Sequence, residues 1–242
     1  MEESNKFELY YWPLLTRGEF VRLIFVENEQ EWSEPLLENG FSHEKMSKFK
    51  KENPFFKAVP VLKHKGFLLS QTPEIVRYAA KHSGNGSVWP KDELEQYQCG
   101  EIFLCILDVM QEGQTAYHAI KLNAHYHDQR EQTQPFIKTY YADRVPEWVD
   151  FFERRLKLNK DSEFFVGKNL TYADLAVFFM FEGFDAVQDM KDYWVKMRAE
   201  GRMQAIDEFC KRIRERPKIK KWIEEGRKAR GLKFYGDSCP GN

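Results

Sequence analysis

The chain has 242 residues, a length that fits either one or two domains. Apolar residues make up 42% of it and aromatic residues 15%, which excludes a disordered chain. With 37 basic and 38 acidic side chains, the formal net charge of -1 produces no overall field that would attract nucleic acid or an anionic membrane surface. We therefore expect a globular protein without a nucleic-acid partner.

Two further features of the composition concern the compartment. The longest strongly apolar stretches, 102–110 and 175–181, are far shorter than the ~20 residues that cross a bilayer, and the polar, acidic first residues predict no signal peptide. Four cysteines without a CxxC pair are too few for a disulfide scaffold. These patterns predict a cytoplasmic protein with no membrane partner.

The first 82 residues mix strand patterns with helix patterns. Strands are expected at 7–12, where apolar and polar side chains alternate, and more weakly at 31–36. Two short apolar runs on either side of Lys65 and Gly66 predict a hairpin. Helical spacing is seen over 19–27. A second helix is expected to end at residue 81 and to begin with Thr72 as the N-cap and Pro73 as the first helical residue. The order β-α-β-loop-β-β-α predicts a small α/β domain over residues 1–82.

Helical periodicity dominates the rest of the chain. Residues 83–92 contain glycines and a proline and are expected to form a linker, residues 93–230 an all-helical domain, and residues 231–242 a loosely attached tail. The expected helices are 93–124, 130–157, 171–186, 202–215 and 217–229. Thr171 and Asp174 form a capping-box pattern ahead of an apolar run, which indicates the start of a core helix.

The histidines of the helical half do not form a metal-binding pattern. His125 and His127 stand at i and i+2, which places them on different faces of a helix, and His118 has no neighbouring cysteine to complete a zinc site. We expect no metal site.

The candidate functional residues lie in the first domain. Tyr11 ends the first strand, and Arg17 stands at the start of the following helix, where exposed N–H groups favour a negative charge. Strand alternation places Tyr10 on the opposite face. Gln71 and Thr72 lead into another helix N-terminus, which can hold a carboxylate. The alternative interpretations are that Tyr11 merely packs and that Thr72 is an ordinary helix cap.

Taken together, these segments resemble the cytosolic glutathione transferase superfamily. Its members have a thioredoxin-like N-terminal domain and an all-α C-terminal domain, use glutathione as co-substrate without a metal, and are usually homodimers. The segments that carry the resemblance, in chain order, are Leu9–Pro13, Arg17–Phe25, Pro54–Phe55, Val59–Leu62, Leu69–Tyr78, Gly167–Asp174, Arg216–Pro217 and Trp222–Ile223.

The resemblance is to the tyrosine-type classes (sigma, mu, alpha and pi). A tyrosine followed by an aromatic residue ends the first strand in these classes, as Tyr11 and Trp12 do here. Residues 1–98 contain no cysteine, which argues against thioredoxins, glutaredoxins and cysteine-type transferases, because their chemistry needs a thiolate at this turn. A serine-type site is disfavoured too, since Thr16 is the only hydroxyl between Trp12 and Arg17.

The resemblance implies a chemical role for two of these residues. Tyr11 would donate its O–H to the sulfur of glutathione and favour the thiolate over the thiol. Arg17 would add a positive field near the site.

The resemblance also implies which residues bind glutathione. Val59 would pair its backbone with the cysteinyl part, and Pro60 would follow a cis peptide bond. Gln71 and Thr72 would hold the γ-glutamyl carboxylate. The glycyl carboxylate would meet Lys50 or its neighbour Lys51, and Asp108 would reach the glutathione of a partner subunit.

The sequence departs from the family pattern at several positions. Met46 stands where the sigma-like pattern has tryptophan, and Thr72 stands where serine is usual. Residues 54–60 form a stretch one residue longer than usual, and residues 185–207 are also longer and have no assigned role.

The implied function is conjugation of glutathione to small hydrophobic electrophiles. Two alternatives remain open: a non-catalytic ligand-binding or structural relative, and a glutathione-dependent isomerase or peroxidase that uses the same site.

Overall fold

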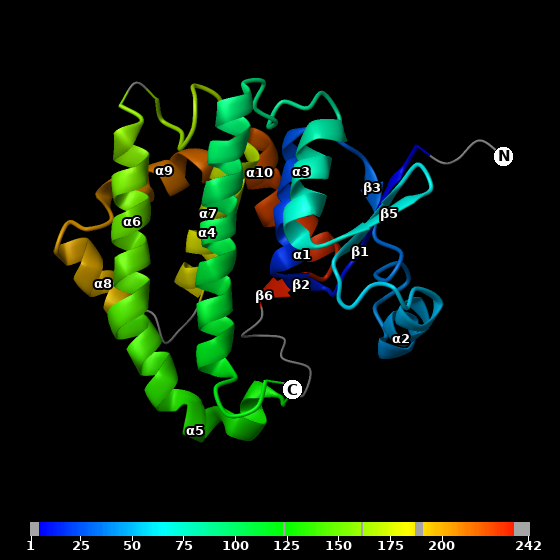
Figure 1. The fold of residues 1–242 in the computed structure, drawn as a ribbon, viewed down its shortest axis with the longest axis horizontal. Helices are drawn as coiled ribbons and strands as arrows, with labels where there is room; N and C mark the ends of the chain where they lie inside the picture. Colours follow the sequence, from blue (N-terminus) through cyan, green and yellow to red (C-terminus); the bar gives the residue numbers. More distant parts are fainter. Residues whose placement is uncertain (1–4, 123, 161, 187–190, 235–242) are drawn as a thin grey trace. The chain divides into compact units, whose positions relative to one another are not determined.

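The computed structural model describes residues 5–122, 124–160, 162–186 and 191–234. Of these, residues 5–89 and 216–234 form one compact unit, and residues 90–215 form a second. The first unit contains a small mixed sheet with helices, and the second is helical, which confirms the predicted fold class (Figure 1).

The sheet of the first unit has four strands in the order β3-β1-β4-β5. Strand β1 (Phe7–Tyr10) pairs in parallel with β3 (Trp32–Ser33) and antiparallel with β4 (Val61–His64). Strand β4 then pairs antiparallel with β5 (Phe67–Ser70). The predicted hairpin is confirmed, because Lys65 and Gly66 both have the positive φ of a tight turn between these two strands.

The alternation of β1 divides its side chains between two helical layers. Phe7 contacts Phe25 of helix α1 (Arg17–Glu27), and α1 packs beside α3 (Thr72–His82). On the other face, the ring of Tyr10 stacks on Phe49 of α2 (His43–Glu52), with 4.4 Å between ring centroids. The sequence did not predict α2, because Met46 and Phe49 are its only buried residues and the remainder is polar.

The start of α3 differs from the prediction in one detail. The cap is Gln71, in the left-handed region at φ 71°, and Thr72 is already the first helical residue, with Pro73 in the first turn. Thr72 is buried, whereas Gln71 is exposed.

The C-terminal helical segment, residues 216–230, belongs to the first unit, whereas the sequence pattern predicts it in the all-helical domain, residues 93–230. It consists of α10 (Pro217–Lys221), a π-helical turn η3 (Trp222–Gly226) and α11 (Arg227–Ala229), and α10 packs against α1. A short strand β6 (Lys233–Phe234) then pairs in parallel with β2 (Leu14–Leu15). Part of the expected loose tail is therefore a strand, and residues 235–242 lie outside the described part of the chain.

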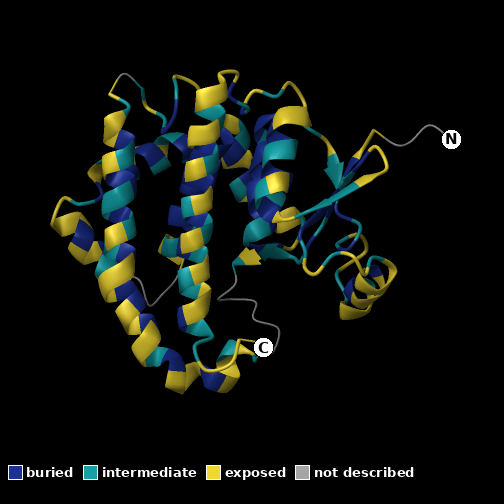
Figure 2. Ribbon diagram, in the orientation of Figure 1, coloured by how far each residue is buried: buried dark blue, intermediate teal, exposed yellow. Residues whose placement is uncertain are grey.

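The second unit is built around helix α7 (Tyr172–Ala186), in which every residue from Tyr172 to Glu182 is buried; Figure 2 colours the chain by burial. The other helices are α4 (Glu93–Tyr117), α5 (Tyr126–Thr139), α6 (Val145–Leu158), α8 (Lys191–Ala199) and α9 (Gln204–Arg214). A π-helical turn η1 (Tyr140–Arg144) joins α5 to α6, so the segment expected at 130–157 is one continuous helical run. None of the described helices meets the length and apolarity needed to span a bilayer.

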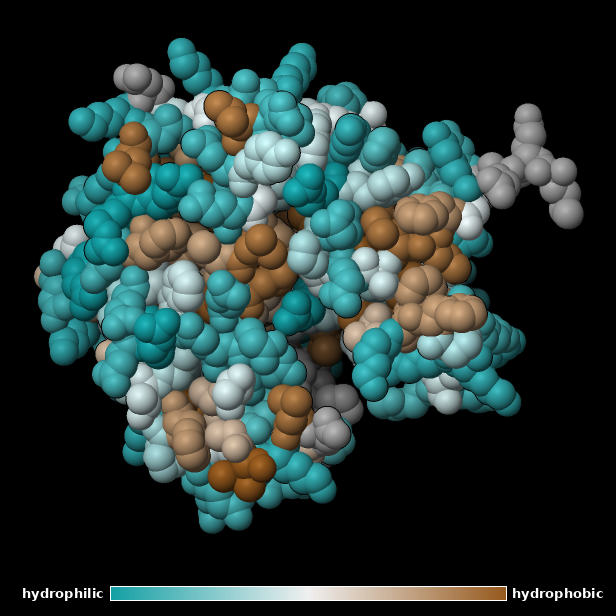
Figure 3. Space-filling model, viewed as in Figure 1, coloured by the Kyte–Doolittle hydropathy of each residue, from teal (hydrophilic) through white to brown (hydrophobic). Residues whose placement is uncertain are grey.

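Helix α4 keeps three large apolar side chains at the surface. Leu94, Tyr97 and Leu104 are each more than half exposed and follow helical spacing. Figure 3 shows hydrophobic side chains at the surface along α4. These three residues share their face of α4 with two exposed acidic residues, Glu101 and Asp108, so the face is mixed.

The start of α7 has one half of the capping box predicted from the sequence, the bond from the Thr171 backbone to the Asp174 carboxylate. The buried carboxylate of Asp174 accepts hydrogen bonds from Thr171 N at 2.8 Å, from Thr171 Oγ1 at 2.7 Å and from Phe165 N at 2.8 Å. One side chain therefore closes the loop that precedes the central helix.

We expect Asp174→Ala to lower the free energy of unfolding by about 2–4 kcal/mol, because three buried donors lose their acceptor. Urea unfolding followed by far-UV circular dichroism measures the change. The control is Asp174→Asn, which keeps one acceptor oxygen and should cost less than alanine. Equal stability of all three proteins would contradict this role for Asp174.

Candidate active site

Three predicted site segments meet at one end of the sheet. The register places Tyr10, at the end of β1, opposite Val61, and Val61 opposite Ser70, at the end of β5. Paired strands lie about 4.8 Å apart, so the residues that continue these strands are close neighbours. Tyr11, Pro60 and Gln71 are those residues.

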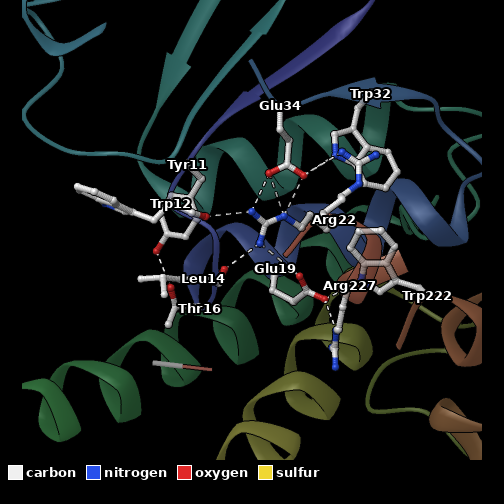
Figure 4. A network of polar contacts seen from close by, with 11 residues as sticks. Tyr11, Trp12, Leu14, Thr16, Glu19, Arg22, Trp32, Glu34, Trp222 and Arg227 are labelled. Atoms are coloured by element: carbon white, nitrogen blue, oxygen red, sulfur yellow. Dashed lines mark hydrogen bonds and ion pairs between the residues drawn. The ribbon is translucent and has the colours of Figure 1, made fainter. Parts of the chain in front are cut away.

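Tyr11 is held tightly at the start of the β1–α1 connection. Its side chain is only 5% exposed, and its hydroxyl lies 2.7 Å from Thr16 Oγ1, as Figure 4 shows. The ring lies against the backbone of Gly18, where a Cβ atom would approach Tyr11 Cδ1 to 2.4 Å. Glycine at position 18 therefore allows the ring to pack on the first turn of α1.

The surroundings of Tyr11 act on its ionisation in opposite directions. Burial raises the pKa of the phenol, whereas the Thr16 hydroxyl, the guanidinium groups of Arg22 and Arg17 and the backbone of Arg17 lower it. Burial has the larger effect, so the net pKa lies above its ordinary value of 10.0. Tyr11 is therefore a neutral hydrogen-bond donor at neutral pH, in a positive field.

The two predicted basic residues lie on different helices. Arg17 is the first residue of α1, and its charge acts on the Tyr11 phenol. Lys50 is exposed in the last turn of α2, where its Nζ lies 5.7 Å from the centroid of the Trp12 ring. This contact brings Lys50 next to the residue that follows Tyr11, and Lys51 is exposed at the next position of α2.

Val59 and Pro60 lie just ahead of the paired part of β4. Their peptide bond is cis, as the family resemblance implies. Val59 packs against the same apolar cluster as Trp12, which includes Met46 and Phe49 of α2. The β1–β4 and β4–β5 ladders start at Val61, so the backbone of Val59 lies outside both.

Among the predicted site residues, Gln71 has an unusual backbone conformation, with φ at 71°. A positive φ is uncommon for a residue with a side chain and is seen most often at functional positions and turns. This conformation turns the chain from β5 directly into the N-terminus of α3, whose first N–H groups have no partner within the helix. Gln71 and Thr72 therefore stand at a site suited to an anion.

Asp108 is not part of this group. It is exposed on α4, in the second unit, on the face that carries Leu104.

Sequence reasoning missed three residues that shape the site. The sequence pattern identifies Thr16 only as a hydroxyl and assigns no role to Gly18 or to Arg22, which stands among the apolar residues of α1. Arg22 is fully buried, and its NH2 and NH1 groups donate to Trp12 O at 3.2 Å and to Leu14 O at 2.8 Å. The sequence feature that could have identified Arg22 is its charge within a helix whose other residues are mostly apolar and buried.

Comparison with known proteins agrees with the two-part fold. The family model "Glutathione S-transferase, N-terminal domain" matches residues 6–81, and "Glutathione S-transferase, C-terminal domain" matches residues 116–226.

Individual relatives match most of the chain. A glutathione S-transferase of Plasmodium falciparum is 29% identical over 222 residues, covering 89% of this chain and 93% of the relative. One of Plasmodium yoelii yoelii is 31% identical over 175 residues, covering 70% and 74%. The crystal structure of the glutathione S-transferase from Ascaris lumbricoides shares the fold, with a TM-score of 0.68 and 23% identity over 91% of this chain and 97% of that one.

The two matching domain models and the relatives lead to the same family. This chain is an enzyme of the glutathione S-transferase superfamily.

Proposed function

We propose that the protein joins glutathione to small hydrophobic electrophiles and that Tyr11 stabilises the reacting thiolate. The observation that carries this proposal is the Tyr11 hydroxyl, fixed 2.7 Å from Thr16 Oγ1 at the sheet end that also holds Pro60 and Gln71. A free thiol has a pKa of about 8.5 and is mostly protonated at neutral pH. A hydrogen bond to the thiolate lowers that pKa.

The Thr16 contact suits Tyr11 for this role. When Thr16 donates its O–H to the phenolic oxygen, the phenolic hydrogen is left to point at the sulfur. The same hydrogen bond and the positive charges of Arg17 and Arg22 make the phenol a stronger donor, while burial keeps it neutral. The thiol proton leaves to solvent, the sulfur forms a bond to the electrophilic carbon, and a halide or similar group departs with its electron pair.

Glutathione would be bound by groups that surround Tyr11. The unpaired backbone of Val59, ahead of Pro60, is available for strand-like pairing with the cysteinyl unit. The N-terminus of α3, with Gln71 and Thr72, suits the γ-glutamyl carboxylate. Lys50, or Lys51 beside it, supplies a positive charge for the glycyl carboxylate.

The role of Tyr11 predicts a large effect of removing one oxygen atom. Tyr11→Phe should lower kcat/KM for an aryl halide about 100-fold at neutral pH and raise the pH midpoint of the reaction by about two units, because each unit of thiol pKa changes the thiolate fraction tenfold. Steady-state kinetics across the pH range measure both changes.

The matched control is Tyr10→Phe, which removes the same oxygen from the opposite face of β1. Its hydroxyl donates to Glu8 at 2.6 Å, away from the proposed site, so its pH profile should match that of the unmodified protein. Equal activity of the three proteins would rule out Tyr11 as the thiolate-stabilising residue.

Binding of the γ-glutamyl carboxylate predicts a different kind of defect. Thr72→Val keeps the shape of the side chain but loses its hydroxyl, and it should weaken glutathione binding about tenfold, the value of one hydrogen bond to a charged group. Calorimetric titration gives the Kd. Thr72→Ser keeps the hydroxyl and should bind nearly as well. If valine and serine bound alike, the hydroxyl would have no part in binding.

We propose that the protein is a homodimer and that α4 forms part of its interface. Leu94, Tyr97 and Leu104 lie along one exposed face of this helix. Asp108 is exposed one turn beyond Leu104, which suits the expectation that it reaches the glutathione of the partner subunit.

The proposed interface predicts that Leu104→Glu halves the molecular mass in solution, because a buried unpaired carboxylate is costly at a contact between subunits. Light scattering coupled to gel filtration gives the mass. Leu158→Glu, at a still more exposed leucine at the end of α6, should leave the mass unchanged. A dimer that survives Leu104→Glu would place the interface elsewhere.

We also propose a cytoplasmic location. Cys99, Cys105 and Cys210 are free thiols, as is usual in a reducing compartment.

A further inference from the structure

The connection from Tyr11 to Thr16 has its backbone fixed from two directions. The carbonyl oxygens of Trp12 and Leu14 accept hydrogen bonds from the buried Arg22 guanidinium, at 3.2 and 2.8 Å. The carbonyl oxygen of Pro13, between them, accepts from the backbone N–H of Lys233 at 3.2 Å. Three successive carbonyls are therefore held by α1 and by the C-terminal segment.

The hydrogen bond from Lys233 to Pro13 is part of a strand pairing. Leu14 and Leu15 of β2 pair in parallel with Lys233 and Phe234 of β6, at more than 200 residues' separation along the chain. A two-residue strand has no stability of its own, so β2 depends on this partner.

The helical part of the C-terminal segment has its own anchors on the first unit. Glu19 Oε1 accepts from Trp222 Nε1 at 2.7 Å and from Arg227 Nε at 2.9 Å. Arg230 donates to Glu34 at 3.3 Å, and its guanidinium lies 4.4 Å from the centroid of the Trp32 ring. These contacts involve side chains ahead of β6, so the strand can be released while they remain.

We propose that β6 is a positioning element for Tyr11. Its pairing with β2 keeps the Tyr11 hydroxyl next to Thr16 Oγ1 and within hydrogen-bonding distance of the sulfur of bound glutathione. This inference rests on the proposed role of Tyr11. Tyr11 and Thr16 stand at the two ends of the connection that pairs with β6. If the backbone between them became mobile, the distance between their hydroxyls would increase. Displacement of a catalytic group by about 1 Å is enough to lower a rate by a large factor.

One substitution removes the backbone donor of the hydrogen bond to Pro13 while leaving the side-chain anchors of residues 222–230 in place. The Lys233 side chain is exposed, and its N–H is the donor to Pro13. Lys233→Pro removes that donor, whereas Lys233→Ala removes the side chain and keeps it. The readout is the pH midpoint for ionisation of enzyme-bound glutathione, followed by thiolate absorbance, together with kcat/KM at neutral pH and the glutathione Kd.

Lys233→Pro should raise the pH midpoint by about one unit and lower kcat/KM about tenfold, with a Kd close to that of the unmodified protein, because a tenfold loss of thiolate corresponds to one unit. Lys233→Ala should leave all three values unchanged. An unchanged midpoint in a folded Lys233→Pro protein would overturn the inference. If that protein does not fold, a chain ending at Leu232 replaces it, and the same shift is expected.

A parallel titration of Tyr11→Phe separates this inference from the proposal on which it rests. If Tyr11→Phe does not shift the midpoint, the role of Tyr11 fails, whatever Lys233→Pro does. If Tyr11→Phe shifts the midpoint and Lys233→Pro does not, Tyr11 keeps its role and only the positioning by β6 is refuted.

Discussion

The buried guanidinium of Arg22 is the constraint on which the arrangement of the first unit depends. A fully buried charge is costly unless it is paired and its hydrogen-bond donors are satisfied. Glu34 accepts from both Nε and NH2, at distances down to 2.7 Å, and Glu19 approaches NH1 at 3.4 Å. Burial works against the charge, yet Glu34 and Glu19 raise the net pKa of Arg22, so it stays ionised.

The same group links the core to the site. After pairing with two carboxylates, Arg22 still donates to the carbonyls of Trp12 and Leu14, and its charge lies 5.9 Å from the centroid of the Tyr11 ring. The two carboxylates in turn accept from the C-terminal helical segment. One ion network therefore fixes the path of the β1–α1 connection, adds a positive field at the phenol and attaches residues 216–230 to α1 (Figure 4).

The proposed glutathione site follows from how the sheet ends. Each strand supplies one part: Tyr11 follows β1, Pro60 precedes β4 and Gln71 follows β5. None of these residues needs a long or flexible side chain to reach the others, because strand register sets their spacing. In the proposed site, the backbone of Val59, the N-terminus of α3 and Lys50 or Lys51 in the last turn of α2 would bind the tripeptide, and Tyr11 would act on its sulfur.

Elements whose apolar residues repeat with a clear local period could be predicted from the sequence. These are β1, the β4–β5 hairpin, α1, α3 and α7, and with them the position of Tyr11 at a strand end beside a helix N-terminus. Helix α2 was missed because its buried face has only two residues, Met46 and Phe49. The tertiary structure alone decided the partner of the Tyr11 hydroxyl, the need for glycine at position 18 and the pairing of β2 with β6. These depend on contacts between residues that local periodicity does not relate, and β2 and β6 are far apart along the chain.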